Sequence, residues 1–470
     1  MKKTVSRILS LLICGALLVT VAGCGTRVEE ESVWIEGDST VSTITHSSGT
    51  KGESNVTTDA DGITNVEGID TTKSDKDNLK GATVVVGYYR SDDGGKPSPS
   101  APTYQDEIKL ISDIEKKYNC KIEYKTVGNA MEYYGAWAAA AQAGTKFCDI
   151  LQISSAYVLP THFRAGYLTN LDDYLDTDSV IYNKRAMEQI EYDGKHYITI
   201  MSNRLYDPAG MYFNRKVFEA FGVDTPDVYV KNNQWDWNKF VELAKATTGI
   251  KNGVQYYGYC SDSGNVDAWA TSNGASMVVK NKNGKYVSNV TSEGYIKAIQ
   301  HAYDLYNTHK VMGGSWEDGT AAMVMGRPNY GAGYMETLGS KNVGFTYIPK
   351  GPDVSTFNAT VDETTAWGIP ATVKNPGVMA KIMYDLTYPY KWRQTLEQQQ
   401  EANFSDATSL KTAMDLIVKA NENIGLEPLY SYIRRLKLTD FGFKSQTSPR
   451  VFAASVEGEI QAEVDEFWAQ

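Results

Sequence analysis

Five segments between residues 82 and 153 alternate between two hydrophobic patterns, and this alternation constrains the fold more than any other feature. Ala82–Gly87 and Cys148–Ile153 are rich in apolar residues, as is typical of strands buried on both faces. Lys121–Val127 alternates apolar and polar residues, as a half-buried strand does. The segments that follow Ala82–Gly87 and Lys121–Val127 are predicted to form helices. Residues 108–118 carry apolar residues at helical spacing, and residues 131–143 are rich in alanine. This order predicts a parallel α/β sheet with right-handed crossovers, whose ligands bind beyond the carboxyl ends of the strands.

A second series of apolar segments begins near residue 200 and runs to the C-terminus. Asp236 or Asn238 can cap the helix that starts at Trp237, because each offers a side-chain acceptor for the first free N–H groups. The expected strands are 209–214, 343–348 and 366–371, and the expected helices are 216–221, 237–247, 294–306 and much of 413–470.

The N-terminus has the three parts of an export signal. Basic residues come first, an apolar core of Ile8–Val21 follows, and small residues lead to Cys24. A core this short does not span about 30 Å of hydrocarbon, which argues against a permanent transmembrane helix. Val21–Cys24 resembles the bacterial lipobox, which implies that residues 1–23 are a lipoprotein signal peptide and that Cys24 carries lipid such as palmitate. An ordinary secretory signal, or an uncleaved anchor with Cys24 placed by chance, is the alternative.

Residues 24–80 are predicted to form a disordered tether. They are rich in Ser, Thr and Gly, acids outnumber bases, and the scattered apolar residues build no periodic face. A poorly packed extra subdomain is the alternative. The chain beyond them exceeds the roughly 250–300 residues at which single cores stop growing, so we expect two lobes or domains. The tether would hold this body off the cell membrane, on its extracytoplasmic face.

The acidic charge of the chain limits its partners. The formal net charge is −11, and removal of the basic signal leaves a still more acidic remainder. This balance argues against nucleic acid as a partner and against electrostatic attachment to anionic lipid. Contact with the membrane is therefore expected to come from the lipid on Cys24.

Three cysteines remain beyond the signal: Cys120, Cys148 and Cys260. An odd number outside the cytoplasm leaves at least one free thiol. Cys120 and Cys148 each begin a strand-like run, so they either pair or serve as small core residues. No C-x-x-C spacing occurs and the histidines show no metal-ligand spacing, so we expect no metal site and no cofactor.

The short motifs of common enzyme classes are missing, so we expect a protein that is not an enzyme. There is no Walker A motif, no strand-flanked G-x-G-x-x-G, no H-E-x-x-H and no G-x-S-x-G. Carboxylate pairs for glycoside hydrolysis carry no such motif, so a lipid-anchored glycan-degrading enzyme stays open as an alternative. The 31 Tyr and 9 Trp, many in polar loops, favour a carbohydrate site, because their rings stack on sugars and their polar groups bind hydroxyls.

Five segments, in their order and spacing, resemble the bacterial family 1 extracellular solute-binding proteins. The resemblance extends from about Ala82 to the C-terminus, with Trp316 where the family usually has Phe. It implies the substrate-capturing component of an ABC importer, most often for sugars and oligosaccharides. The segments are GTKFCDILQISSAYVLPTHFRAGYLTNLDDYLD, then DGKHYITIMSNRLYDPAGMYFNRKVFEAFGVDTP with WDWNKFVELAKATT after it, WEDGTAAMVMG, VGFTYIPKGPD and WGIPATVKNP.

The resemblance implies an α/β, two-lobed periplasmic-binding-protein-like fold with a hinge and an interlobe cleft. Lobe one would comprise residues 82–200 plus 364–400, and lobe two residues 201–363 plus 401–470. The hinge segments would be Tyr197–Ser202 and Glu363–Thr365. The hinge would close around a solute before presentation to the permease subunits of an ABC transporter, and we expect a monomer.

The same resemblance suggests ligand-binding residues by their positions in loops and beside the hinge. Hydroxyls and amides suit sugar hydroxyls, and tryptophan rings suit stacking on a sugar, with core packing as their alternative. For the arginines, surface ion pairs are the alternative. The candidates are Tyr89, Arg90, Ser154, Ser155, Asn203, Arg204, Asp207, Trp269, Arg327, Tyr330, Asp362 and Trp367.

Other solutes and other roles stay open on the sequence. The same fold could take a peptide, a polyamine or an anion. A site rich in carboxylates would favour cations, and one rich in arginines would favour uronates or other anions. A sensor or adhesin that uses the fold without transport is a further alternative.

Overall fold

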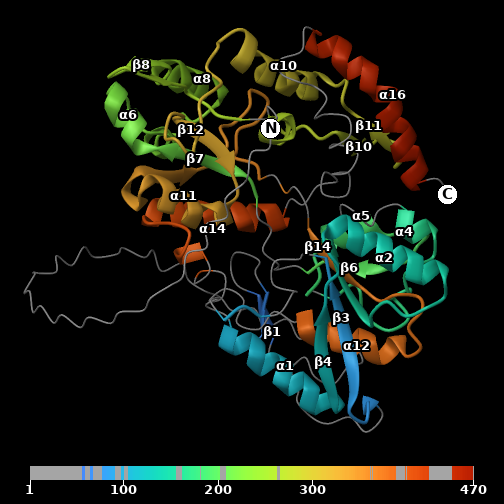
Figure 1. The fold of residues 1–470 in the computed structure, drawn as a ribbon. Helices are drawn as coiled ribbons and strands as arrows, with labels where there is room; N and C mark the ends of the chain where they lie inside the picture. The colour runs from blue at the N-terminus through green and yellow to red at the C-terminus, as the bar shows by residue number, and fades with distance from the viewer. Residues whose placement is uncertain are drawn as a thin grey trace, which may run out of the picture. The chain divides into compact units, whose positions relative to one another are not determined.

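The computed structural model contains two sheets of three or more strands (Figure 1). It describes residues 56–58, 64–66, 77–89, 97–99, 104–154, 161–179, 181–201, 208–261, 265–359, 361, 364–387, 397, 400–422 and 447–468. The predicted signal peptide, Cys24 and most of the predicted tether lie outside these residues. Across the described ranges, no helix combines the length and the apolar character needed to cross a membrane.

The first sheet has five strands in the order β4-β3-β5-β14-β6. β3 (Ala82–Tyr88), β4 (Cys120–Lys125) and β5 (Ile150–Ser154) pair in parallel, which confirms the parallel layer predicted from the alternating segments. β14 (Thr365–Gly368) runs antiparallel to both β5 and β6 (Ile198–Thr199). A strand from late in the sequence therefore completes a sheet that the N-terminal part of the folded body begins.

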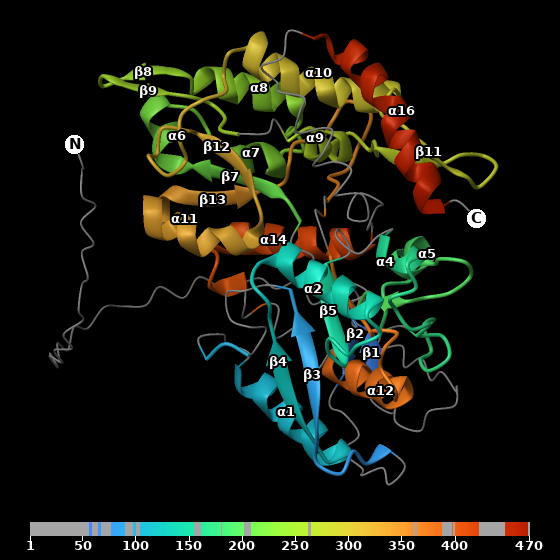
Figure 2. The ribbon, with the colours of Figure 1, turned by 45° about the vertical axis from the view of Figure 1, so that its right-hand side comes forward.

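Helices cover both faces of the first sheet (Figures 1 and 2). α1 (Tyr104–Tyr118) and α12 (Pro376–Thr387) pack on one face, where their apolar residues form a cluster with Val84 and Val86 of β3. α2 (Ala130–Gln142) packs with the residues of β5 that point to the opposite face. This double burial explains why β3 and β5 are rich in apolar residues.

A buried carboxylate joins α1 to α12. Oδ2 of Asp385 accepts hydrogen bonds from Nζ of Lys117 and Oη of Tyr118, each at 2.8 Å. Asp385 is only 6% exposed. Burial, together with the negative charge of Asp385, raises the pKa of the Tyr118 hydroxyl well above its usual range. The two hydrogen bonds to Asp385 therefore hold α1 and α12 together, although these helices are far apart in the sequence.

The second sheet has three antiparallel strands in the order β12-β7-β13. They are β7 (Gly210–Asn214), β12 (Met323–Gly326) and β13 (Val343–Thr346). β7 and β13 confirm the strands predicted over 209–214 and 343–348. All the residues of β7 and β13 are buried, and the rings of Tyr212 and Phe345 lie 4.6 Å apart.

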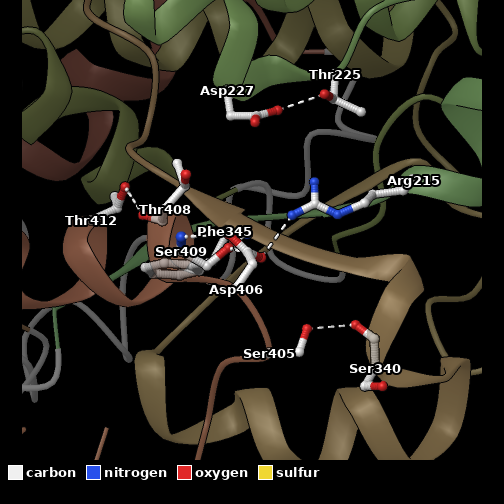
Figure 3. A network of polar contacts seen from close by, with 10 residues as sticks. All are labelled: Arg215, Thr225, Asp227, Ser340, Phe345, Ser405, Asp406, Thr408, Ser409 and Thr412. Atoms are coloured by element: carbon white, nitrogen blue, oxygen red, sulfur yellow. Dashed lines mark hydrogen bonds and ion pairs between the residues drawn. The ribbon is translucent and has the colours of Figure 1, made fainter. Parts of the chain in front are cut away.

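α14 (Ala407–Glu422) packs against β13 through a polar network that Figure 3 shows. Asp406 caps this helix, because its Oδ1 accepts a hydrogen bond from the N–H of Ser409 at 2.9 Å. Its Oδ2 forms an ion pair with Arg215 at 2.8 Å and accepts the Ser409 hydroxyl at 2.9 Å. Oγ of Ser409 accepts the N–H of Phe345 in β13 at 2.9 Å. The network fixes α14 on the second sheet.

The remaining elements complete the described chain. Asp236 caps α8 (Trp237–Ala246), because its Oδ1 accepts the N–H of Lys239 at 2.9 Å, as the sequence allows. β8 pairs with β9 and β10 pairs with β11 as antiparallel hairpins. The remaining elements are α4 (Thr161–Arg164), α5 (Lys184–Ile190), α6 (Arg215–Phe221), α7 (Pro226–Lys231), α8 (Trp237–Ala246), β8 (Gly249–Lys251), β9 (Val254–Tyr256), α9 (Val266–Ser272), β10 (Val278–Lys280), β11 (Tyr286–Ser288), α10 (Glu293–Asn307), η2 (Pro328–Tyr330), α11 (Gly331–Leu338), η3 (Ser340–Asn342) and α16 (Pro449–Trp468).

Two features lie within the segment predicted as a tether. β1 (Val56–Thr58) and β2 (Thr64–Val66) form an antiparallel hairpin. β-Branched residues favour these strands, and the Asp-Gly pair between them is a common hairpin signal. Nearer the folded body, the N–H of Leu79 donates to the carbonyl of Tyr118 at 2.8 Å. The described part of the tether therefore contains local order that its composition does not predict.

The two strand-associated cysteines do not pair. Cys120 and Cys148 are free thiols and both are buried. Cys120 packs in the cluster of α1 and α12, whereas Cys148 packs in the cluster of α2, on the opposite face of the sheet. Burial raises the pKa of Cys120 to about 11, so its thiol is protonated at neutral pH. Both serve as small core residues.

A histidine packs between tryptophans where α8, α9 and α10 meet. The ring of His301 stacks on Trp237 at 4.4 Å and meets the ring of Trp269 edge-on at 4.5 Å. Its Nε2 is buried and has no hydrogen-bond partner among the described residues. Burial lowers the pKa of His301 to about 3, so the ring stays neutral in the folded protein at physiological pH.

Replacement of Asp385 by Leu should destabilise the fold by about 3 kcal/mol, because Lys117 and the Tyr118 hydroxyl lose their shared partner. Urea unfolding monitored by circular dichroism measures the loss. Asp465→Asn is the matched control, since its ion pair with Lys285 is exposed and screened by solvent, so its loss should change the stability much less. Equal losses for the two variants would contradict the role assigned to Asp385.

His301 should make the fold sensitive to mild acid. Below pH 6.5 the unfolded chain binds a proton at this histidine and the folded chain does not, so stability falls with pH. Between pH 7 and pH 5 the loss from this one group is about 2 kcal/mol. His301→Phe should remove that part of the pH dependence, and His309→Gln should retain it. Urea titrations at both pH values test this, and a wild-type pH slope in His301→Phe would contradict the assignment.

Candidate functional site

Tyrosine and serine side chains gather where β3 and β5 end. The rings of Tyr88 and Tyr89 lie 5.8 Å apart, and the ring of Tyr89 lies 6.2 Å from that of Tyr134. The N–H of Ser154, the last residue of β5, donates to Oη of Tyr134 at 2.8 Å. Tyr89 and Tyr134 are each 5% exposed and Ser154 is fully buried. This is the strand end at which ligands of parallel α/β folds bind.

The start of α2 positions Tyr134 at this end of the sheet. Asn129 and Glu132 form a capping box, in which Oδ1 of Asn129 accepts the N–H of Glu132 at 3.2 Å. Oε2 of Glu132 accepts the N–H of Asn129 at 2.9 Å in return. Because the cap fixes the first turn of α2, it also fixes Tyr134, whose hydroxyl accepts the N–H of Ser154 at the end of β5.

Four side chains form a row across the first sheet near the same end. Tyr88 pairs with Gln152, Gln152 pairs with Trp367, and Trp367 pairs with Thr199. Directly paired residues point to the same side of a sheet, so the four share one face. Further from the strand ends, that face carries apolar residues such as Val86. The face therefore changes from apolar to polar toward the carboxyl ends of β3 and β5.

Three of the ligand-binding residues predicted for the first sheet lie in its described part, although Tyr89 packs in the cluster of α2 and Trp367 in the cluster of α1 and α12, on the opposite face. Tyr89, Ser154 and Trp367 lie on the adjacent strands β3, β5 and β14 or directly after them. Trp367 is 7% exposed and its ring also joins the apolar cluster of α1 and α12. The other candidates predicted for this region lie outside the described residues: Arg90, Ser155, Asn203, Arg204, Asp207 and Asp362.

A second group of predicted residues lies at one end of the second sheet. Gly326, the last residue of β12, pairs with Gly210, the first residue of β7. Arg327 follows directly and Tyr330 ends the turn η2 after it, and Oη of Tyr212 donates toward the carbonyls of Arg327 at 2.9 Å and of Pro328 at 3.0 Å. The phenol therefore fixes the backbone that carries the two candidates. Tyr330 is 44% exposed, which leaves part of its ring available to a solute.

Aromatic rings connect this end of the sheet to the core. Tyr330 lies 6.0 Å from Tyr334, which meets Tyr212 edge-on at 4.9 Å. Burial raises the pKa of Tyr334 to about 12, so its hydroxyl stays neutral. At the same sheet end, Tyr347 follows β13 and stacks on Phe357 at 4.3 Å. Sequence reasoning missed Tyr347, although its place near the end of the strand predicted over 343–348 was a usable signal.

Trp269 packs as a core residue in this structure. It has no exposed surface, and the rings of Trp237 and Phe240 lie 6.1 Å and 5.0 Å from its own. With His301 on a further side, it offers no open ring face for a sugar. The polar residues around it in the sequence suggested a loop, whereas the structure places it in the middle of α9.

Gln152 and Thr199 are candidate site residues that sequence reasoning also missed. Gln152 is a polar residue between the apolar residues Leu151 and Ile153 of β5, so its position in the sequence was a signal. Thr199 lies in a two-residue strand that the sequence does not predict. In the part of the chain that the structure describes, no group of three or more His, Cys, Asp or Glu side chains is placed to hold a metal ion.

Residues 98–383 match a sequence family described as "Bacterial extracellular solute-binding protein". No curated protein is similar enough in sequence to be matched to the chain. Several solved structures share its fold. One is the GacH receptor of Streptomyces glaucescens, solved unliganded and with acarbose, which has 18% sequence identity and a TM-score of 0.59, with 82% of this chain and 99% of that chain covered.

Two further structures show that this fold occurs with different ligands. An ABC transporter associated binding protein from B. animalis subsp. lactis, in complex with beta-1,6-galactobiose, has 16% identity and a TM-score of 0.56, with 83% and 98% of the chains covered. UgpB from Mycobacterium tuberculosis, in complex with glycerophosphocholine, has 15% identity and a TM-score of 0.56, with 82% and 98% covered. The α/β two-lobed fold predicted from the sequence is confirmed.

Proposed function

The chain belongs to the bacterial extracellular solute-binding protein family, and from this premise we propose that it captures a sugar or oligosaccharide for an ABC transporter. The observation that supports this solute class is the chemistry at the two strand ends. The side chains described there are mainly hydroxyls, an amide and aromatic rings, as in Gln152, Ser154 and Tyr330. Sugars offer matching hydroxyl groups and C–H faces.

The proposal places the solute between two lobes that close on it. The lobe boundaries and the hinge segments Tyr197–Ser202 and Glu363–Thr365 are part of this proposal. Closure would remove water from the hydroxyl and aromatic groups of both strand ends, which strengthens their hydrogen bonds to the solute. The closed form would then be the one that the permease subunits recognise.

We also propose that lipid on Cys24 holds the protein on the outer face of the cell membrane. The lipobox-like sequence supports this anchor, and the acidic net charge makes electrostatic attachment to anionic lipid unfavourable. The segment 24–80 would keep the binding body within reach of the permease. The protein would act there as a monomer and without enzymatic activity.

A thermal-shift screen of the full chain in detergent tests the solute class. At a hundred times its Kd, a neutral mono- or oligosaccharide should stabilise the fold by about 2.7 kcal/mol. The screen should include a peptide, a polyamine, a uronate and a glycerophosphodiester. A shift with one of these charged solutes and with no neutral saccharide would contradict the proposal.

The exposed tyrosine of the second sheet should contribute to affinity for the saccharide. Tyr330→Ala should weaken binding about three- to tenfold, because a ring that stacks on a sugar is lost. Tyr174→Ala is the control, since Tyr174 is 41% exposed, close to the 44% of Tyr330. Titration calorimetry compares the two variants, and equal affinities would exclude a contact by Tyr330.

Replacement of Cys24 by Ala should release the protein from the membrane, because the lipid attachment atom is removed. Fractionation of cells that express the wild-type chain or the variant measures this change. Cys260→Ala is the control for loss of a thiol. If the Cys24→Ala chain stays in the membrane fraction and the processing of its signal is unchanged, the lipid anchor is wrong.

A further inference from the structure

Two polar atoms in the cross-strand row of the first sheet are buried without partners. Oε1 of Gln152 and Oγ1 of Thr199 have no hydrogen bond from any described residue. Gln152 is 7% exposed and Thr199 is 1% exposed. Buried polar atoms are nearly always paired, and an unpaired one destabilises the fold. Two such atoms in one row of paired strands indicate that these side chains serve a purpose other than the stability of the fold.

The position of the row suggests that a bound solute supplies the missing hydrogen-bond partners. Trp367 lies between Gln152 and Thr199 and pairs with both. Thr199 lies within the proposed hinge segment 197–202, and Trp367 follows the proposed hinge segment 363–365 within two residues. If the proposed hinge closes there, its movement would act on the strands that carry the row. The row is also next to the strand ends at which solutes of such folds bind.

The chemistry of the row selects an uncharged donor. Oε1 of Gln152 needs a hydrogen-bond donor, and an ionised carboxylate or phosphate group has none to offer; the four residues of the row also include no cation to balance a buried negative charge. An ammonium group could donate to it, but the four residues of the row include no carboxylate to balance a buried positive charge. A hydroxyl group donates without a charge, and Oγ1 of Thr199 can both accept from it and donate to it.

We propose that Gln152 and Thr199 bind hydroxyl groups of an uncharged, polyhydroxylated solute, and that they thereby select neutral sugars over acidic, amino or phosphorylated ones. This inference rests on the proposed function and specifies the solute class. The unpaired atoms of the free protein gain partners when the solute binds, so part of the affinity comes from relief of an unfavourable burial. A site built to bond a hydroxyl also discriminates strongly against analogues that lack it.

The proposal predicts opposite effects on stability and on affinity. Thr199→Val keeps the shape and the β-propensity of the side chain but removes the unpaired oxygen. The melting temperature of the free chain should therefore rise or stay unchanged, whereas binding of the neutral saccharide found by the screen should weaken about tenfold. Gln152→Met keeps the length of its side chain and should behave in the same way.

Thr247→Val is the matched control. Thr247 is fully buried like Thr199, but its hydroxyl donates to the carbonyl of Leu243 at 2.8 Å. Loss of this bond should lower the melting temperature and leave the affinity for the saccharide unchanged. Calorimetric titration and thermal melts of the full chain in detergent compare the three variants with wild type.

Three outcomes would contradict this inference, and only the last of them also contradicts the proposed function. If wild type binds a neutral saccharide and the Thr199 and Gln152 variants bind it equally well, the proposed row is wrong and the proposed function stands. If Thr199→Val lowers the melting temperature as Thr247→Val does, its oxygen is paired and the proposal also fails. If wild type binds only charged solutes, the proposed function fails and this inference fails with it.

Discussion

The pairing of β14 with β5 and β6 is the constraint on which the rest of the structure depends. β14 occupies residues 365–368, yet it lies between two strands that precede residue 200. All three strands of the second sheet precede β14 in the sequence, so the chain passes through the second sheet before it returns to complete the first. This connection sets Trp367 between Gln152 and Thr199, and it brings α12 beside α1, where Asp385 joins the two helices. The geometry of the candidate site and the stability of the first sheet therefore have one origin.

The two sheet ends suit a solute that is neutral and rich in hydroxyls. At the first, a phenol holds the end of β5, and a polar row replaces an apolar face. At the second, the phenol of Tyr212 holds the backbone that carries Arg327 and Tyr330. In both places a buried aromatic hydroxyl fixes main-chain atoms, which leaves the adjacent side chains positioned for a ligand before it arrives. Such preorganisation reduces the entropy that binding costs.

The elements that the sequence predicted best were those with strong local patterns. Two of the three parallel strands from Ala82 to Ser154 follow from apolar-rich segments and the third from alternation of apolar and polar residues, and the start of α8 follows from the capping residue Asp236. β6 has only two residues and forms only because β14 pairs with it, so no local pattern in the sequence predicts it. Trp269 was predicted to face a ligand because its neighbours in sequence are polar, whereas packing by Trp237, Phe240 and His301 buries it. Burial of a side chain depends on which helices meet there, and that information is not local.

Hydrogen–deuterium exchange of the full chain, with and without the saccharide that stabilises it, tests the central claim most directly. The account predicts protection at the strand ends that carry the candidate residues, in 82–89, 150–154, 197–201, 326–330 and 365–368. Peptides from α16, 449–468, serve as the internal reference and should exchange at the same rate in both samples. Protection confined to regions outside these strand ends, or none at a saturating concentration of the saccharide, would contradict the account.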